Sequence, residues 1–356
     1  MLVRVPETQP SAGAAAAASA PSAVNPVPEQ HSERTSRWRS AWFILATLSL
    51  VVVLIPVLAR LLGVEAGPLA IVVSLMPWVT LACLVPLAFA LLARSWPLVM
   101  VAAALLALCA FWAVPLFTSQ QANDGQVLTV ASLNLTFGGA DADAVVGLAR
   151  DNEVDVLAAQ EVTPEAVEEL RVAGLDDLFP YSEVAAEPGV TGTALWSRTP
   201  LTDAQTLERA SEVEELGGYV SHAVRGDIEV AGDTVTVFAV HPVAPGLKQH
   251  AAWKADLERF TQELAGQSEP TLVLGDFNTT RDHRAFREIE SLGFADAADQ
   301  AGAGFLPTFP EGRGPWPFVA IDHALVGHSD LVATGVSTAA VPGADHRMLL
   351  VTYSTR

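Results

Sequence analysis

Carboxylate, amide and imidazole side chains recur in this sequence directly beside short apolar segments that have the composition of β-strands. Asn134 ends one such segment, Glu161 follows the next, and His241 comes directly after a later one. Loops at the ends of strands in α/β folds are where ligand-binding and catalytic groups gather. We therefore expect these polar residues to meet in one site.

The C-terminal part of the chain repeats this pattern. Asp276 and Asn278 follow an apolar strand in the run Gly275-Asp276-Phe277-Asn278. Asp322 lies at the start of another strand, and the pair Asp345-His346 directly precedes the last one. These residues join the same predicted site.

The predicted set is rich in carboxylates, with amides and imidazoles but no cysteine. Hard oxygen ligands suit Mg²⁺, with Mn²⁺ as an alternative, better than structural zinc. An aspartate that orients a histidine makes it a directed general base, and a metal beside it can polarise a phosphoryl oxygen. The sequence contains neither a Gly-x-Ser-x-Gly elbow nor a Walker phosphate-binding motif. The pattern favours metal-assisted hydrolysis of a phosphate ester over acyl transfer.

A family resemblance rests on these same motifs. In order and spacing they are similar to those of the endonuclease/exonuclease/phosphatase superfamily, which includes deoxyribonuclease I-like enzymes, apurinic endonucleases and neutral sphingomyelinases. The motifs are Leu133-Asn134, Gln160-Glu161, Gly275-Asp276-Phe277-Asn278, Ile321-Asp322-His323 and Asp345-His346-Arg347. The resemblance implies a four-layer α/β sandwich with two mixed β-sheets and Mg²⁺-dependent phosphoester cleavage.

The resemblance also implies which residues bind metal. Glu161 would be the principal metal ligand, and Asn134 would assist it in the metal and phosphate shell. Asp345 would add a further metal contact.

Five further residues would carry catalysis by the same resemblance. His241 would donate to the phosphoryl oxygens in the transition state, and Asn278 would orient the scissile phosphate. Asp276 would position or activate the nucleophile or leaving group. Asp322 would orient His346, which would act as general base on water.

Each position also admits a purely structural interpretation. Asn134 could end a strand in a turn, and Glu161 could cap the helix predicted to begin near Thr163. Asp276 and Asn278 could form an Asx-turn. The combination of motifs favours the functional interpretation.

The elements that must position these residues alternate between strands and helices across residues 127–356. Asp141 and Thr163-Pro164 are predicted helix starts, because each offers a side-chain cap. Such alternation predicts one large α/β domain.

Three apolar stretches precede this domain, and each exceeds the roughly 20 residues that a helix needs to cross a bilayer. They are Trp42–Leu62, Pro68–Leu92 and Trp96–Phe117. We expect three transmembrane helices within residues 41–117, with Arg60 snorkelling at the end of the first. We expect residues 1–40 to form a disordered cytoplasmic tail and residues 118–126 to form a short linker.

Basic residues beside the spans predict the orientation. Arg34, Arg37 and Arg39 precede the first span, and Arg94 separates the second from the third. By the positive-inside rule, we expect a multi-pass plasma-membrane protein with its N-terminus in the cytoplasm and its catalytic domain outside the cell.

The charge distribution bears on the substrate. The formal net charge is −20 over 356 residues, and residues 119–356 hold 36 of the 40 acidic side chains but only 14 of the 20 basic ones. Such a domain lacks the basic track with which a nuclease grips nucleic acid. We expect a phospholipid headgroup or small phosphate ester as substrate. The first alternative function is a metal-dependent endonuclease or exonuclease. The second alternative is a non-catalytic domain that binds a phosphoryl ligand.

Overall fold

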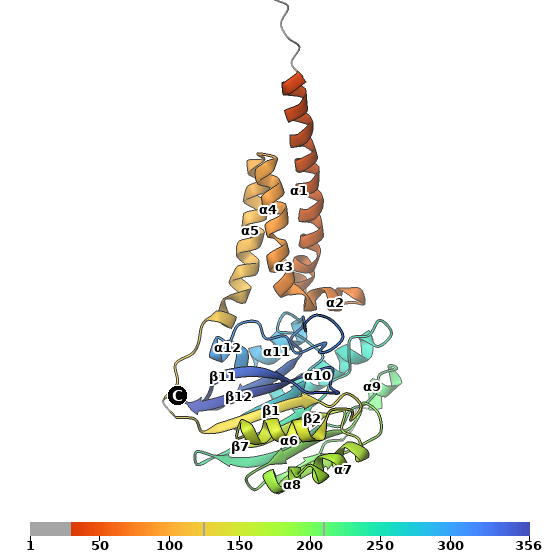
Figure 1. Ribbon diagram of the computed structural model, residues 1–356, viewed down its shortest axis with the longest axis vertical. Helices are drawn as coiled ribbons and strands as arrows, with labels where there is room; N and C mark the ends of the chain where they lie inside the picture. The colour runs from red at the N-terminus through yellow and green to blue at the C-terminus, as the bar shows by residue number, and fades with distance from the viewer. Residues whose placement is uncertain (1–29, 124, 209–210) are drawn as a thin grey trace, which may run out of the picture.

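The protein has two parts, a bundle of apolar helices and an α/β domain at one end of it (Figure 1). The computed structural model describes residues 30–123, 125–208 and 211–356. Most of the predicted disordered tail therefore lies outside the described residues. Residues 30–40 of that tail are instead helical, because helix α1 spans Gln30–Leu62. Once the apolar stretch is helical, each preceding residue without Pro or Gly adds a further hydrogen bond without a new nucleation step.

Two helical segments are long and apolar enough to cross a membrane, Ser36–Leu62 and Trp96–Phe117. The prediction of a continuous middle span was wrong. That stretch is divided into α2 (Pro68–Ser74), α3 (Met76–Ala82) and α4 (Leu84–Leu92), with a bend of 70° between α2 and α3. It makes a third candidate span only if the bent pair counts as one. Pro77 explains the break, since proline lacks the N–H that would continue the helix and its ring clashes with the preceding turn.

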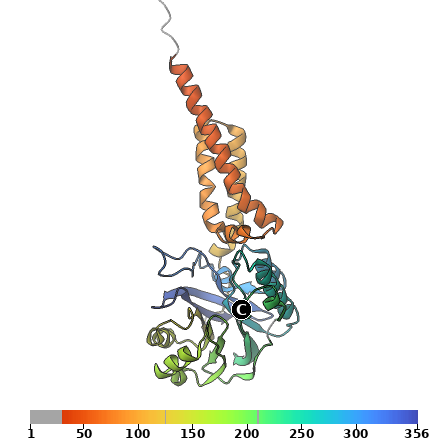
Figure 2. The ribbon, with the colours of Figure 1, turned by 90° about the vertical axis from the view of Figure 1, so that its right-hand side faces the viewer.

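The three long segments of the bundle run side by side. Helix α4 packs against α1 and against α5 (Trp96–Ala113), which ends in a 3₁₀ turn, η1 (Val114–Phe117). Helix α2 lies across the bundle axis at the end that meets the α/β domain (Figures 1 and 2). The bend therefore places α2 between the bundle and the domain.

The α/β domain contains two mixed sheets, as predicted, and each sheet has six strands. The first has the order β11-β12-β1-β2-β4-β3 and the second β5-β6-β7-β8-β10-β9. The first sheet comprises β1 (Leu128–Asn134), β2 (Val156–Gln160), β3 (Tyr181–Ala185), β4 (Thr193–Ser197), β11 (Leu331–Ala340) and β12 (Arg347–Thr355). The second comprises β5 (Thr202–Thr206), β6 (Val224–Val230), β7 (Asp233–Val240), β8 (Thr271–Asp276), β9 (Ala295–Asp296) and β10 (Asp322–Gly327).

Helices cover the outer faces of the two sheets (Figure 1). The helices are α6 (Ala142–Asp151), α7 (Pro164–Val172), α8 (Leu175–Leu178), α9 (Ser211–Glu215), α10 (His250–Ala265), α11 (Arg284–Ser291) and α12 (Ala297–Ala301). Asp141 and Thr163 cap α6 and α7 as predicted, by accepting hydrogen bonds from the backbone N–H groups of Ala144 and Ala166.

Three apolar clusters hold the layers together. Alternate residues of β1 face opposite ways: Val130 is buried between the two sheets, and Leu133 beneath the helices of the first sheet. A third cluster, which includes Phe277 and Phe286, fills the space between the second sheet and its helices. The resulting four layers agree with the predicted sandwich.

Strand directions bring the predicted site residues to one edge. β1 and β2 are parallel with Asn134 opposite Gln160, and β7 and β8 are parallel with Val240 opposite Gly275. β12 runs antiparallel to β1, and β10 runs antiparallel to β8 with Asp322 opposite Asp276. The ends of β1, β2, β7 and β8 therefore lie beside the starts of β10 and β12.

Candidate active site

Asn134 connects two carboxylates at the centre of this edge. Its amide nitrogen donates to Glu161 Oε1 and to Asp276 Oδ2, each at 3.1 Å, and its amide oxygen accepts from the backbone N–H of Thr136. Asn134 and Asp276 are both buried. Glu161 follows β2 with a left-handed φ of 54°, a conformation that is costly for a residue other than glycine. The fold therefore holds two carboxylates toward one point.

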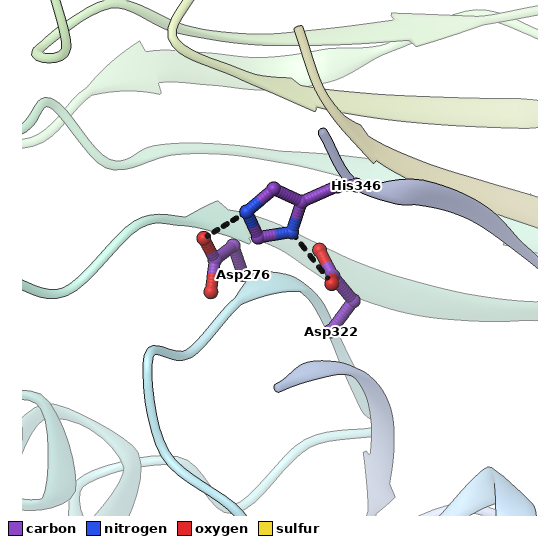
Figure 3. A group of neighbouring side chains, drawn as sticks. All are labelled: Asp276, Asp322 and His346. Carbon is purple, nitrogen blue, oxygen red and sulfur yellow. Dashed lines mark hydrogen bonds and ion pairs between the residues drawn. The ribbon is translucent and has the colours of Figure 1, made fainter. Parts of the chain in front are cut away.

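His346 lies between two aspartates (Figure 3). Its Nδ1 is 2.9 Å from Asp322 Oδ2, and its Nε2 is 3.6 Å from Asp276 Oδ2. Phe309 packs beside the imidazole, with the ring centroids 4.8 Å apart. The orientation of the ring is thus fixed on three sides by residues from other elements.

The electrostatics of this group follow from burial and from the two carboxylates. Burial opposes the charged imidazolium, but Asp322 and Asp276 outweigh it and raise the pKa of His346 to about 10. Burial also opposes ionisation of Asp276, yet the imidazoles of His346 and His241 hold its pKa at about 2. Burial raises the pKa of Asp322 above its ordinary value, and His346 only partly offsets this. The two flanking carboxylates therefore favour the charged imidazolium form of His346.

His241 and Asn278 border the same carboxylate. His241 Nδ1 lies 3.2 Å from the carbonyl oxygen of Val190, which leaves Nε2 facing Asp276 Oδ2 at 3.5 Å. Burial opposes a charge on His241, but Asp276 raises its pKa above the ordinary value. The backbone N–H of Asn278 donates to Asp276 Oδ1 at 2.8 Å, as in the Asx-turn interpretation. Both residues present nitrogen donors around Asp276.

Asp345 joins the site through Thr136. The Thr136 hydroxyl donates to Asp345 Oδ1 at 2.5 Å, while the Thr136 N–H bonds to Asn134. The other carboxylate oxygen forms a 2.6 Å ion pair with Arg313, whose side chain is 60% exposed. Asp345 is thus linked to Asn134 and also faces the surface.

The donor atoms fit a hard divalent cation. Ligand atoms of Asp276, Asp322 and His346 all lie within 4.8 Å of one another. Asp322 Oδ1 is buried without a hydrogen-bond partner in the described part of the chain. Carboxylate and amide oxygens are ligands that Mg²⁺ and Mn²⁺ accept. The predicted metal ligands border this group: Asn134 bonds to Glu161 and to Asp276, and Asp345 is joined to them through Thr136.

Comparison with protein families identifies the domain. The model of the family described as Endonuclease/Exonuclease/phosphatase matches residues 131–346, more than half of the chain. The chain belongs to this family. The match begins within β1 and ends at His346, so it contains all the predicted site residues.

Solved structures resemble the same part of the chain. An endonuclease/exonuclease/phosphatase from Beutenbergia cavernae has 18% identity and a TM-score of 0.51, over 65% of this chain and 72% of that one. One from Bacteroides vulgatus has 20% identity and a TM-score of 0.51, over 65% of this chain and all of that one. Humanised D. rerio TDP2 has 14% identity and a TM-score of 0.51, over 64% of this chain and 99% of that one. These likenesses concern the fold, and no curated protein matches the sequence.

All eight site residues predicted from the sequence therefore lie at one end of the family fold, while their individual roles remain predictions. Family members are generally phosphoester hydrolases that depend on a metal. The structure adds residues that sequence reasoning missed: Thr136, Arg313 and Trp253, whose indole N–H donates to the Asn278 carbonyl at 3.1 Å. No local signal identifies them, because each acts across a contact between distant segments.

A second histidine–aspartate pair lies beside the site but does not open into it. His323 Nδ1 is 2.6 Å from Asp296 Oδ2, and its Nε2 is 3.1 Å from the carbonyl oxygen of Thr279. Both side chains are buried, and the imidazole packs against Phe277. This pair holds the backbone that follows Asn278.

Proposed function

We propose that this protein is a membrane-anchored, outward-facing, Mg²⁺-dependent phosphoester hydrolase that acts on phospholipid headgroups or small phosphate esters. The observation that carries the proposal is the convergence of Asn134, Glu161 and Asp276 with the His346–Asp322 pair. An enzyme that cleaves phosphoesters needs charge neutralisation, an oriented phosphate and a proton acceptor, and this group offers all three.

The cation would be held by Glu161 and Asn134 with help from Asp345, and it would polarise a phosphoryl oxygen and neutralise its charge. His241, with its raised pKa, would carry a proton toward a phosphoryl oxygen. The Asn278 amide, which now donates to the Pro242 carbonyl at 3.0 Å, would orient the phosphate.

His346 would accept the proton of the attacking water. Asp322 fixes the ring by its bond to Nδ1 and stabilises the imidazolium that forms. Because two carboxylates raise the pKa of His346 to about 10, the neutral ring becomes more abundant as pH rises. We therefore expect the hydrolysis rate to increase between neutral and alkaline pH.

Two features support a substrate at the membrane surface. Trp316 and Phe318 are 62% and 42% exposed on the loop that precedes β10. The Phe318 carbonyl accepts a 2.7 Å hydrogen bond from the indole of Trp78 on α3, so this loop lies against the helical bundle. Exposed aromatic residues beside an anchor suit contact with lipid headgroups, where aromatic rings are enriched.

The path of the chain supports three membrane crossings. α1 and α5 both end at the side of the bundle that faces the catalytic domain, so the chain must return between them (Figure 1). The segment Met76–Leu92 makes this return, and at about 1.5 Å per residue it is long enough for most of a bilayer core. With three crossings, the positive-inside asymmetry of Arg34, Arg37, Arg39 and Arg94 supports a cytoplasmic N-terminus and a catalytic domain outside the cell.

A nuclease is the second candidate, favoured by a family whose description includes endonucleases and exonucleases. The acidic composition of residues 119–356 weighs against it, because counterion release from phosphates requires Lys and Arg contacts. A binding domain without catalysis would not need the oriented pair of His346 and Asp322.

The test uses the full chain in nanodiscs, with Mg²⁺ or with EDTA. Bis-p-nitrophenyl phosphate, plasmid DNA and mixed phospholipid or sphingomyelin vesicles are assayed in parallel. We expect EDTA-sensitive cleavage of lipid or of the small diester, abolished by Asp276→Asn and His346→Gln. Asp155→Asn is the matched control, because Asp155 accepts the Thr129 N–H at the opposite end of the same sheet.

Other outcomes would contradict specific parts of the proposal. Cleavage of DNA with lipid and diester untouched would establish the nuclease instead. Full activity in both site variants would refute the assigned site. A topology reporter fused after Arg356 should be active only outside the cytoplasm, and cytoplasmic activity would reverse the orientation.

A further inference from the structure

The loop that carries Asn278 touches the membrane anchor. It runs from Phe277 to His283, between β8 and α11, and it contacts α1 and α2 across the boundary between the two parts of the protein. Asn278 has a left-handed φ of 47°, so its conformation needs support from its surroundings. Some of that support comes from residues more than 200 positions earlier in the sequence.

Arg60, at the end of α1, forms a buried ion pair with this loop. Its Nε lies 2.6 Å from Asp282 Oδ1, and the side chains are only 9% and 6% exposed. The guanidinium also stacks on Trp112 of α5, 3.8 Å from the ring centroid. The sequence-based expectation that Arg60 snorkels to solvent was therefore wrong, because an acidic partner from the catalytic domain covers it.

Helix α2 contacts the end of the same loop. His283 Nε2 lies 2.9 Å from the carbonyl oxygen of Ala70, and the Arg284 N–H donates to Glu65 Oε1 at 2.5 Å. Arg287 donates to the Arg60 carbonyl at 3.0 Å. The start of α11 is therefore bound to the anchor through main-chain and side-chain groups.

A third contact reaches Asn278 itself. Ala70 is fully buried and forms a small apolar cluster with Trp253 and Leu257 of α10. The Trp253 indole packs edge-on against His283 and donates its N–H to the Asn278 carbonyl at 3.1 Å. Trp253 thus links the anchor helix to the residue proposed to orient phosphate.

We infer that the anchor positions the catalytic centre: α2, through Trp253, and Arg60, through Asp282, hold the loop that sets the place of Asn278. Trp253, Arg60 and Ala70 are positioning residues and touch no reacting atom. The inference rests on the proposed function, because Asn278 matters only if the site binds a phosphoryl group.

A simple docking contact would not require this arrangement. Asp282 lies four residues from Asn278, and the bonds from Trp253 and His323 fix the carbonyl groups of Asn278 and Thr279. Removal of Arg60 would leave a buried carboxylate without its partner, and Asp282 would move toward water. Such a movement is transmitted over a few residues of restrained backbone directly to Asn278.

The experiment compares full-length variants in nanodiscs by kinetics and by hydrogen exchange. Arg60→Ala removes the ion pair, and Arg60→Lys keeps its charge. Trp253→Phe keeps the ring but removes its N–H donor, whereas Ala70→Leu crowds the contact with Trp253. Two controls apply similar changes away from the domain: Trp38→Phe near the start of α1, and Ala90→Leu, a buried position in α4.

We expect Arg60→Ala, Trp253→Phe and Ala70→Leu to lower kcat on the order of tenfold, because displacements below 1 Å in a positioned site have costs of this size. KM should change less than about twofold, since these residues do not contact substrate. Amide exchange should accelerate in residues 277–283 but stay unchanged in β1. Arg60→Lys should recover much of the lost kcat, and both controls should match the wild type.

Three results would overturn the inference. The first is a kcat in the variants equal to that of an active wild type. The second is amide exchange in residues 277–283 of the variants equal to that of the wild type. The third is amide exchange that accelerates equally throughout the domain. The last would mean that the contacts only stabilise the fold. If the wild type hydrolyses no substrate, the proposed function fails, while the exchange comparison still decides whether the anchor holds this loop.

Discussion

The hydrogen bond between His346 and Asp322 allows the sharpest test of the catalytic site. We predict that Asp322→Asn lowers kcat and leaves the fold intact. The bond spans 2.9 Å, and the two side chains are 6% and 0% exposed. Asparagine has the same size but no charge, and its amide can donate to Nδ1, which would favour the wrong tautomer of the imidazole.

The size of the effect follows from the type of bond. A hydrogen bond to a charged group contributes about 1.5–3 kcal/mol in proteins. Since about 1.4 kcal/mol corresponds to a tenfold change in rate, we expect kcat to fall about 10- to 150-fold. Asp276 still faces Nε2 and limits the loss.

The assay is steady-state hydrolysis of bis-p-nitrophenyl phosphate at saturating Mg²⁺, with thermal unfolding measured on the same samples. Asp155→Asn serves as the control, since it removes a carboxylate from the opposite end of the sheet. A kcat within threefold of the wild type, in a folded Asp322→Asn protein, would refute the proposed orientation of His346.

Three further predictions concern metal, pH and packing. Glu161→Gln should weaken Mg²⁺ binding and reduce the upward shift in Tm that Mg²⁺ causes in the wild type, and an unchanged shift would exclude Glu161 as a ligand. Burial and the nearby Asp296 raise the pKa of Glu290 to about 7. In the unfolded chain the pKa of Glu290 is about 4.5. The folded state is therefore stabilised by the neutral carboxyl below pH 4.5, and it loses this stabilisation as pH rises through 7. Glu290→Gln should thus raise the free energy of unfolding by about 2–3 kcal/mol at pH 8 but little at pH 4, and equal effects at both pH values would contradict this. A Cβ on Gly275 would lie 2.1 Å from the Val240 carbonyl oxygen, so Gly275→Ala should cost about 1–3 kcal/mol in unfolding experiments and lower kcat. An unchanged free energy of unfolding would contradict this close approach of β7 and β8.

The position of the site could be predicted from the sequence because its signals are local. Each functional residue follows or precedes an apolar strand, and parallel strands bring such ends together whatever the details of packing. Asn134, Asp276 and His346 illustrate this, since their relation depends only on strand order and direction.

Other features could not be predicted from the local sequence, because they depend on contacts between segments that are distant in the chain. Arg60 near the end of an apolar helix has the sequence pattern of a snorkelling residue, and only Asp282 changes that outcome. The bend before α3 was missed because prolines are tolerated in membrane helices, and hydropathy alone does not locate the break.

The pairing of β1 with β12 affects how the protein folds. Leu128 lies opposite Tyr353, so this interior pair of the first sheet closes a loop of more than 200 residues. Non-local pairings of this kind slow folding, because the entropy of closure is lost before the contacts form. Until β12 arrives, one edge of β1 lacks a partner and is open to aggregation. Since His346 directly precedes β12, the same slow step both protects this edge and completes the proposed site. Activity should therefore emerge only when the sheet has closed.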